Sequence, residues 1–248
     1  MSPPVFLLPP GSLGDAVTGT HVEVSGDEGK HGIRSLRLRL HESVELVDGE
    51  GRRVRGSVHE IEPAAFSVSI ETVVDEDPLL PSLTVVQALA KGDRGESAVE
   101  MLTECGVDRI VPWSAERSIS VWKADRRERG LRRWRSVAKA ASKQARLARL
   151  PQVTELHSTS EVIDLFGGDT QVLVLHEEAH DRLAATAILE AKTLLLIVGP
   201  EGGLSGEEVS RFVEAGAHAV RLGDSVLRTS TAGVVAAAIV ATRSGRWS

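Results

Sequence analysis

The stretch that decides the fold of this chain is LLLIVGPEGGLSGEE, Leu194–Glu208. Its first five residues, Leu194–Val198, are all apolar, which is typical of a strand buried on both faces of a parallel sheet. Three glycines within Gly199–Gly203 predict a sharp turn whose backbone can approach a ligand closely. Ser205 stands three residues before Glu208, the capping-box pattern of a helix start. The stretch therefore predicts a strand, a tight loop and a helix.

The Gly199–Gly203 loop does not match the usual nucleotide-binding fingerprints. The dinucleotide fingerprint needs glycines at positions i, i+2 and i+5, but position 201 is Glu. The chain also lacks the Gly-Lys-Ser/Thr sequence of a P-loop. Taken alone, such a loop is more often a tight turn than a binding site, so a binding role depends on the segments around it.

Further apolar runs alternate with helical patterns along the second part of the chain. They are Leu83–Ala88, Ile110–Pro112, Val172–Leu175 and Ala219–Leu222. This alternation predicts an α/β fold with a mostly parallel sheet covered by helices on both faces. Ligands bind such sheets outside the carboxyl ends of the strands. We therefore expect one pocket from the segments that follow three of the runs, at Leu175-His176, Gly199–Gly203 and Leu222–Arg228.

Residues 1–74 show an alternation of apolar and polar residues with a period of two. The alternating groups are Leu36, Leu38 and Leu40 with Arg37 and Arg39 between them, then Val44 and Leu46, Val54 and Val58, and Phe66, Val68 and Ile70, with turns expected at Gly26–Gly29 and Asp48–Gly51. Many short strands predict a small β-barrel or sandwich. The charged, proline-bearing segment Glu71–Pro81 predicts a boundary between domains at 1–74 and 75–248.

The net charge of −6 hides a segregation of charge along the chain. Residues 117–149 hold 12 basic and 2 acidic residues, a local charge of +10, so the remainder carries −16. From Leu131 onward the spacing of apolar residues predicts a helix. No acid lies between Leu131 and Leu150 to compensate its basic stripe, so a phosphate-binding ridge is favoured over a solvated face. The stripe consists of Arg132, Arg135, Lys139, Lys143 and Arg146.

Composition narrows the class of protein. A single cysteine, Cys105, cannot form an internal disulfide, and the longest apolar stretch, Gly233–Ala241, is far shorter than the ~20 residues of a membrane span. No secretory start is apparent, so we expect a cytoplasmic protein without membrane contact. With 4 Phe, 4 Trp and no Tyr, recognition of RNA by rows of stacking aromatics is disfavoured.

His176–His180 satisfies the His-Glu-x-x-His pattern of zinc peptidases. That chemistry needs both imidazoles on one face of a helix, whereas His176 directly follows the apolar run Val172–Leu175 and so sits at a strand end. We expect His176 to line the pocket and no metal to be bound. A zinc hydrolase acting through His176 and His180 stays open as the less favoured alternative.

Arg228 lies between Leu227 and a hydroxyl-rich helix start at Thr229–Thr231. Its guanidinium stays charged and therefore requires an anionic or carbonyl partner. By local sequence alone, a capped helix with a surface arginine is the commoner interpretation.

Together these elements resemble the bacterial small-subunit rRNA uridine-N3 methyltransferases of the RsmE type, members of the SPOUT class. The resemblance covers nearly the whole chain. Its most specific pieces are Ile197–Ser205 with Glu207-Glu208, and Leu222-Gly223 followed by Val226–Thr229. Supporting pieces are His31 with Leu36-Arg37, Lys91–Asp93, Thr103-Glu104 with Gly106-Val107, and Gln144 before Pro151.

The resemblance implies a trefoil-knotted methyltransferase domain at 75–248 behind a PUA-like RNA-binding β-barrel at 1–74. It implies methylation of uridine N3 in 16S rRNA, at the decoding centre of the small ribosomal subunit, by a homodimer that uses S-adenosylmethionine. Arg228 would stabilise charge on the uracil, and Glu201 would accept the proton or hold the pocket. Cofactor contacts would come from Leu175, His176, Gly199, Pro200, Glu201, Gly202, Gly203, Leu222, Gly223, Val226 and Leu227. RNA contacts would come from Arg34, Arg37, Arg39, Lys91, Arg94, Arg132, Arg135, Lys139, Lys143, Arg146 and Arg149.

The chain departs from the family pattern at several positions. They include Glu100-Met101, Cys105, Leu147, Asp224-Ser225 and Ser230. These changes bear on the RNA contacts more than on the cofactor fold. A catalytically weak RNA-binding or ribosome assembly factor is therefore the main alternative.

Overall fold

The computed structural model describes residues 2–123 and 125–247, which form two compact units. The first unit comprises Met1–Pro78 together with Ser142–Leu150, and the second comprises Leu79–Ala141 and Pro151–Ser248. The division after Pro78 falls inside the predicted boundary segment Glu71–Pro81. The first unit also takes in Ser142–Leu150, a stretch that sequence analysis assigned with the second part of the chain.

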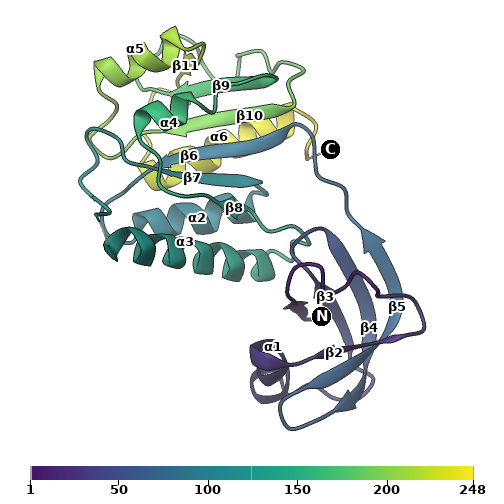
Figure 1. Ribbon diagram of the computed structural model, residues 1–248. Helices are drawn as coiled ribbons and strands as arrows, with labels where there is room; N and C mark the ends of the chain where they lie inside the picture. Colours follow the sequence, from purple (N-terminus) through teal and green to yellow (C-terminus); the bar gives the residue numbers. More distant parts are fainter. Residues whose placement is uncertain (1, 124, 248) are drawn as a thin grey trace. The chain divides into compact units, whose positions relative to one another are not determined.

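The second unit is built on a six-stranded sheet in which every strand pair is parallel. The strand order is β11-β9-β10-β6-β7-β8 (Figure 1). The strands are β6 (Ser82–Ala88), β7 (Arg109–Trp113), β8 (Gln152–Val153), β9 (Thr170–Leu175), β10 (Thr193–Val198) and β11 (His218–Val220). The parallel sheet and its apolar strands are confirmed; the short edge strand β8 was not foreseen.

Helices cover both faces of this sheet, as the continuous apolar runs predict. They are α2 (Arg94–Glu104), α3 (Asp125–Gln144), α4 (Thr159–Ile163), α5 (Gly206–Glu214) and α6 (Thr229–Arg243). On one face, α2, α3 and α6 pack against strand residues such as Val85 and Leu196. On the other face, α4 and α5 pack against residues such as Val86 and Ile197. Successive strand residues thus enter opposite cores, which explains why no polar alternation marks these strands.

The first unit holds a five-stranded sheet in the order β1-β3-β4-β5-β2, with β1 parallel to β3 and the other pairs antiparallel. The strands are β1 (Val5–Leu7), β2 (His21–Val24), β3 (Ser43–Val47), β4 (Arg52–Ile61) and β5 (Phe66–Asp75). Its core gathers residues from every strand, including Phe6, Val24, Leu46 and Phe66. The period-two groups beginning at Val44, Val54 and Phe66 are therefore confirmed as strands.

Three expectations about local structure were wrong. Residues 36–40 form no strand, because His31–Leu36 is a π-helix (η1) and Arg37 adopts a left-handed backbone with φ 55°. Only Leu38 of the three leucines is buried. Gly26–Lys30 forms the short helix α1 in place of a turn.

Two element boundaries also differ from the expectation. β5 continues to Asp75, so the first part of the predicted break is strand. The basic helix begins at Asp125, six residues before Leu131, and ends at Gln144, so Arg146 lies beyond it. Arg146 adopts a left-handed backbone with φ 60°, which no helix residue could maintain.

No helix in the described ranges 2–123 and 125–247 is both long and apolar enough to cross a membrane.

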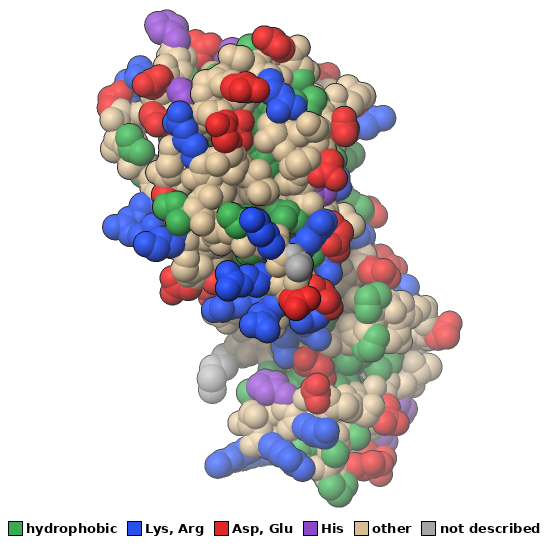
Figure 2. Space-filling model, turned by 60° about the vertical axis from the view of Figure 1, so that its left-hand side comes forward, with side chains coloured by type: hydrophobic (Ala, Val, Ile, Leu, Met, Phe, Trp, Pro, Cys, Tyr) green, Lys and Arg blue, Asp and Glu red, His purple; other side chains and the backbone are tan. Residues whose placement is uncertain are grey.

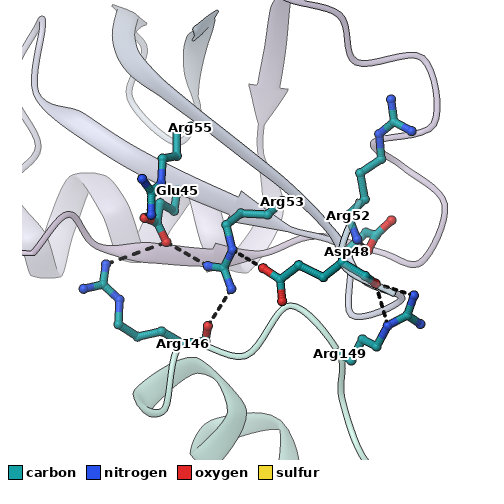
Figure 3. Close-up of polar contacts among 8 residues, drawn as sticks. Glu45, Asp48, Arg52, Arg53, Arg55, Arg146 and Arg149 are labelled. Carbon is teal, nitrogen blue, oxygen red and sulfur yellow. Dashed lines mark hydrogen bonds and ion pairs between the residues drawn. The ribbon is translucent and has the colours of Figure 1, made fainter. Parts of the chain in front are cut away.

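Within the first unit, the buried carboxylate of Glu45 gathers three arginines (Figure 3). Arg53 binds Glu45 at 2.8 Å and Glu76 at 2.5 Å, and also donates to the backbone oxygen of Arg146. Burial by itself opposes the charged guanidinium, but Glu76 and Glu45 outweigh it and raise the pKa of Arg53. We call Glu45, Arg53, Arg55 and Arg146 the Glu45 cluster. It ties residues 142–150 to strands β3 and β4.

The Glu45 cluster should be essential to the stability of the first unit. Glu45→Gln keeps the side-chain volume but leaves the mostly buried Arg53 charge without one of its carboxylates. We expect the free energy of unfolding of this unit to fall by about 3 kcal/mol in urea titrations. The control Asp75→Asn removes an exposed partner of Arg52 in the same unit and should change stability little. Equal effects of the two substitutions would contradict this account.

Candidate functional site

The carboxyl ends of three neighbouring strands, β9, β10 and β11, open onto one cavity of about 580 Å³. The segments that follow these strands line it, as the sequence predicts. The lining includes Leu175, His176, Gly199, Pro200, Glu201, Gly203, Leu222, Gly223, Val226, Leu227 and Arg228. Of the eleven residues predicted to hold a cofactor, only Gly202 is not part of this lining.

The Gly199–Gly203 loop, here the Gly199 loop, is shaped by its glycines and by a neighbouring arginine. Gly203 has φ +71°, a left-handed conformation that favours glycine. A Cβ on Gly202 would lie 3.0 Å from the backbone oxygen of Arg117, so this close approach also favours glycine. The Arg117 guanidinium donates to the oxygen of Leu204 at 3.2 Å. The predicted capping box of Ser205 and Glu208 then begins α5 and is confirmed.

Glu201 is held by the start of α2. Its Oε1 accepts from the backbone N–H of Lys91 at 3.0 Å and from Arg94 at 3.2 Å. Burial opposes the charged carboxylate, but hydrogen bonds from backbone N–H groups and the Arg94 charge outweigh it and lower the pKa of Glu201. A carboxylate with a lowered pKa is a weak proton acceptor. The geometry therefore favours the second of the two expected roles, that of holding the pocket.

Arg228 lies among the cavity-lining residues immediately before α6. Its backbone forms the N-cap of α6, with φ −67° and ψ 151°, and its side chain is exposed. Within residues 2–123 and 125–247, no carboxylate or carbonyl accepts a bond from its guanidinium. Arg228 thus offers an unpaired positive charge beside the cavity, where an added ligand could reach it.

One polar contact of the site was not predicted from the sequence. Gln87, near the end of β6, is fully buried and donates from Nε2 to Oγ1 of Thr229 at 2.9 Å. The same Oγ1 lies 2.7 Å from the backbone oxygen of Gly199. The signal was present as a glutamine within the mostly apolar run Leu83–Ala88. A buried amide needs a hydrogen-bond partner, and that partner lies 142 residues away in sequence.

Most of the predicted basic stripe is compensated by acids from distant parts of the sequence, so the expectation of uncompensated charge was wrong. Within the second unit, Arg135 binds Glu155 at 2.8 Å, and Arg132 pairs with Glu128 one turn earlier. Within the first unit, Lys143 binds Glu28 at 2.9 Å and Arg146 binds Glu45. Arg149, outside the stripe, donates to the backbone oxygen of Glu76 and not to a carboxylate. Of the five residues in the stripe, Lys139 alone has no acidic partner among the described residues.

Other cations have no acidic partner in the part of the chain that the structure describes. In the second unit these include Lys91, Lys123, Arg126, Arg129, Lys139 and Arg228, and in the first unit they include Arg34, Arg37 and Arg39. All of these side chains are exposed. Figure 2 shows exposed Lys and Arg side chains with Asp and Glu side chains between them. Exposed, unpaired cations of this kind are suited to contact phosphates.

His176 and His180 lie in an irregular segment after β9, so the helix that the zinc-peptidase motif requires is absent there. The backbone N–H of His176 donates to Val220, which joins this segment to β11. Among the residues described, no group of three or more His, Cys, Asp or Glu side chains is placed to hold a metal ion.

Comparison with known proteins supplies the chemistry of the site. Residues 76–241 match the family model of an RNA methyltransferase domain. The chain is 41% identical to the ribosomal RNA small subunit methyltransferase E of Mycobacterium tuberculosis, over 93% of this chain and 89% of that protein. It is 26% identical to the protein of that name in Bacillus subtilis, over 84% of this chain and 85% of the relative.

Solved structures agree with the sequence relatives. The crystal structure of a ribosomal RNA small subunit methyltransferase E from Neisseria gonorrhoeae, bound to S-adenosyl methionine, superposes with a TM-score of 0.86 at 27% identity. The match covers 98% of each chain. A probable rRNA-methyltransferase from Porphyromonas gingivalis gives a TM-score of 0.79 at 26% identity, over 99% of this chain and all of that one.

The pKa of Glu201 predicts how Glu201→Gln alters stability with pH. Native contacts lower this pKa, so the carboxylate contributes stability that is present above its unfolded-state pKa of about 4.3 and is lost as the pH falls through the folded-state value. In urea titrations from about pH 7 to pH 3, the advantage of the native protein over Glu201→Gln should be constant near neutrality and shrink below about pH 4.3. An advantage that grows on acidification would contradict the assigned contacts.

Proposed function

This chain belongs to the ribosomal RNA small subunit methyltransferase E family, and we propose that it methylates N3 of a uridine in 16S rRNA at the decoding centre of the small subunit. The observation that carries the proposal is the convergence of three strand ends and Arg228 on one cavity. Relatives of the same name supply the substrate class, and a related structure is bound to S-adenosyl methionine.

The cavity fits S-adenosylmethionine, which supplies the methyl group when bound. Its volume lies within the usual range for small-molecule sites, about 300–1,000 Å³. Gly199 and Gly203 offer backbone peptide groups that no side chain of their own covers, while Leu222 and Leu227 provide apolar walls. Glu201 anchors the loop through its hydrogen bonds from Lys91 and Arg94.

Transfer to N3 requires an in-line displacement by a ring nitrogen that first loses its proton. The enzyme must place N3 about 3 Å from the methyl carbon and favour the anionic form of the base. An unpaired guanidinium beside the cavity stabilises negative charge on a uracil carbonyl, so we assign this role to Arg228. Because its lowered pKa disfavours proton uptake, Glu201 is assigned to support of the loop and not to proton transfer.

For RNA, we propose that the unpaired cations make the phosphate contacts. In the second unit the candidates are Lys91, Lys123, Arg126, Arg129 and Lys139, and in the first unit Arg34, Arg37 and Arg39. Arg94, Arg132, Arg135, Lys143 and Arg146, which pair with carboxylates, would then serve chiefly to fix local structure, as would Arg149, which donates to the backbone oxygen of Glu76. A guanidinium already bonded to a carboxylate must lose that bond before it can take a phosphate in its place.

The wider architecture follows from the same family membership. We propose that the first unit acts as a PUA-like RNA-binding domain, within the sequence-defined range 1–74, and that 75–248 forms a trefoil-knotted SPOUT domain. We further propose that the enzyme works as a cytoplasmic homodimer. The five-stranded sheet of the first unit, with an apolar core that draws on every strand, supports the barrel-like assignment.

Replacement of Arg228 tests the catalytic assignment. Arg228→Ala should abolish methylation of undermethylated small subunits, because no other described side chain supplies this charge from the start of α6. Its exposed side chain should leave the fold and S-adenosylmethionine binding intact, as measured by circular dichroism and calorimetry. Near-normal turnover by Arg228→Ala would contradict the assignment of Arg228 to charge stabilisation.

The salt dependence of RNA binding tests which cations meet phosphates. Replacing Lys123, Arg126 and Arg129 together by Gln should lower the slope of log affinity against log salt by about 2 to 3, since each phosphate contact contributes about 0.7–0.9. The matched control replaces Arg132, Arg133 and Arg135, which lie on α3 as Arg126 and Arg129 do and which pair with Glu128, Glu96 and Glu155. The slope should change less in this control than in the first variant. A larger change in the control would show that the paired arginines bind the RNA.

A further inference from the structure

Two consecutive hydrogen bonds, here the Gln87–Thr229–Gly199 relay, join β6, the start of α6 and the Gly199 loop beside the cavity. Gln87 of β6 donates through Nε2 to the Thr229 hydroxyl at 2.9 Å, and that hydroxyl lies 2.7 Å from the oxygen of Gly199. Gln87 has no exposed surface, and Thr229 is 5% exposed. Thr229 and Gly199 line the cavity, whereas Gln87 does not. Any effect of Gln87 on a bound ligand must therefore be indirect, and its side chain reaches the cavity lining through the Thr229 hydroxyl.

The donors and acceptors available fix the direction of both hydrogen bonds in this relay. The Gly199 carbonyl can only accept, so the Thr229 hydroxyl must donate its single proton to it. The hydroxyl can then only accept from Gln87, which requires the amide nitrogen to face it. Neither a carboxylate nor a reversed amide could satisfy this position without turning the hydroxyl away from Gly199.

Apart from its bond to Thr229, the Gln87 amide makes poor hydrogen bonds. This indicates that the bond from its nitrogen to Thr229 is why a glutamine occupies this position. Nε2 makes a second, longer contact of 3.3 Å to the oxygen of Ala88. Oε1 is buried and has no hydrogen-bond partner within the described residues. A buried oxygen without a donor is destabilising, and an apolar residue in this strand would avoid that penalty. The donor bond to Thr229 is what an apolar residue could not replace.

The relay joins the Gly199 loop to the backbone that carries Arg228, the two parts of the site that must act together. Gln87 is the register partner of Val198, the residue before Gly199. Thr229 directly follows Arg228 and is the first residue of α6. A bond between Thr229 and Gly199 therefore sets the spacing between the start of the Gly199 loop and the backbone that carries Arg228.

We propose that Gln87 and Thr229 are positioning residues that hold the Gly199 loop and Arg228 in register for methyl transfer. The proposal rests on the proposed function, since it takes S-adenosylmethionine as the ligand of the Gly199 loop. Neither residue need touch the reacting atoms. Their effect is on the geometry of the groups that do.

The first test compares Thr229→Val with Thr229→Ser. Val has nearly the same shape but no hydroxyl, so we expect the Kd for S-adenosylmethionine to rise about tenfold and kcat on small subunits to fall about tenfold. Ser keeps the hydroxyl and loses only a methyl group, so both constants should stay within about threefold of the native values. Calorimetry gives Kd, and methylation of undermethylated subunits gives kcat.

Thr103→Val is the matched control. Thr103 of α2 is also fully buried, and its hydroxyl also donates to a backbone oxygen, that of Val99 at 2.7 Å. The same substitution there should lower Tm to a similar degree while leaving Kd and kcat within about twofold. This comparison separates loss of positioning from a general loss of stability.

The second test reverses the donor and acceptor roles in the bond between residues 87 and 229. Gln87→Glu places a carboxyl group at this position, and its ionised form, favoured at alkaline pH, can only accept from Thr229 and draws the proton from Gly199. At alkaline pH it should therefore impair Kd and kcat as much as Thr229→Val. Gln87→Met offers no acceptor of that strength and leaves the hydroxyl free to donate to Gly199, so its loss should be smaller. An equal loss in both variants would overturn the relay.

The outcomes distinguish the two levels of inference. If the native protein fails to bind S-adenosylmethionine, the proposed function fails, and with it the role of the relay. If the native protein binds and methylates but Thr229→Val does so equally well, the relay alone is overturned. Impairment by Thr229→Ser equal to that by Thr229→Val would likewise overturn it, because the hydroxyl would then be irrelevant.

Discussion

The parallel pairing of β10 with β9 on one side and β6 on the other is the constraint on which the rest of the structure depends. Parallel strands bring their carboxyl ends to one edge of the sheet, so segments far apart in sequence meet there. The Gly199 loop, the His176 segment and the residues before α6 become the walls of one cavity for this reason. Gln87 reaches Gly199 through Thr229 because its strand lies beside β10.

Charge in this protein is organised by pairing across the fold. The local charge of +10 in residues 117–149 is real, but acids such as Glu28, Glu45 and Glu155 neutralise several of its members. Pairing converts these arginines and lysines into structural groups, most visibly in the Glu45 cluster. The cations left without acids are the ones available to a polyanion, which narrows the candidate RNA contacts.

The sequence predicted the features that depend on local pattern. Continuous apolar runs gave the parallel strands, and Ser205 with Glu208 gave the capping box that begins α5. Features that depend on long-range partners were not visible: the acids that pair with Lys143 and Arg146, and the bond from Gln87 to Thr229. The alternation at residues 36–40 misled because a π-helix and a left-handed Arg37 bury Leu38 without a strand.

The central claim is that this cavity directs a methyl group to uridine N3 of small-subunit rRNA. The most direct test is mass spectrometry of rRNA nucleosides from a strain that lacks the protein, with and without its return. The account predicts that N3-methyluridine disappears from 16S rRNA when the protein is absent and reappears when it is restored. Unchanged N3-methyluridine, or loss of a different methylated nucleoside, would contradict it.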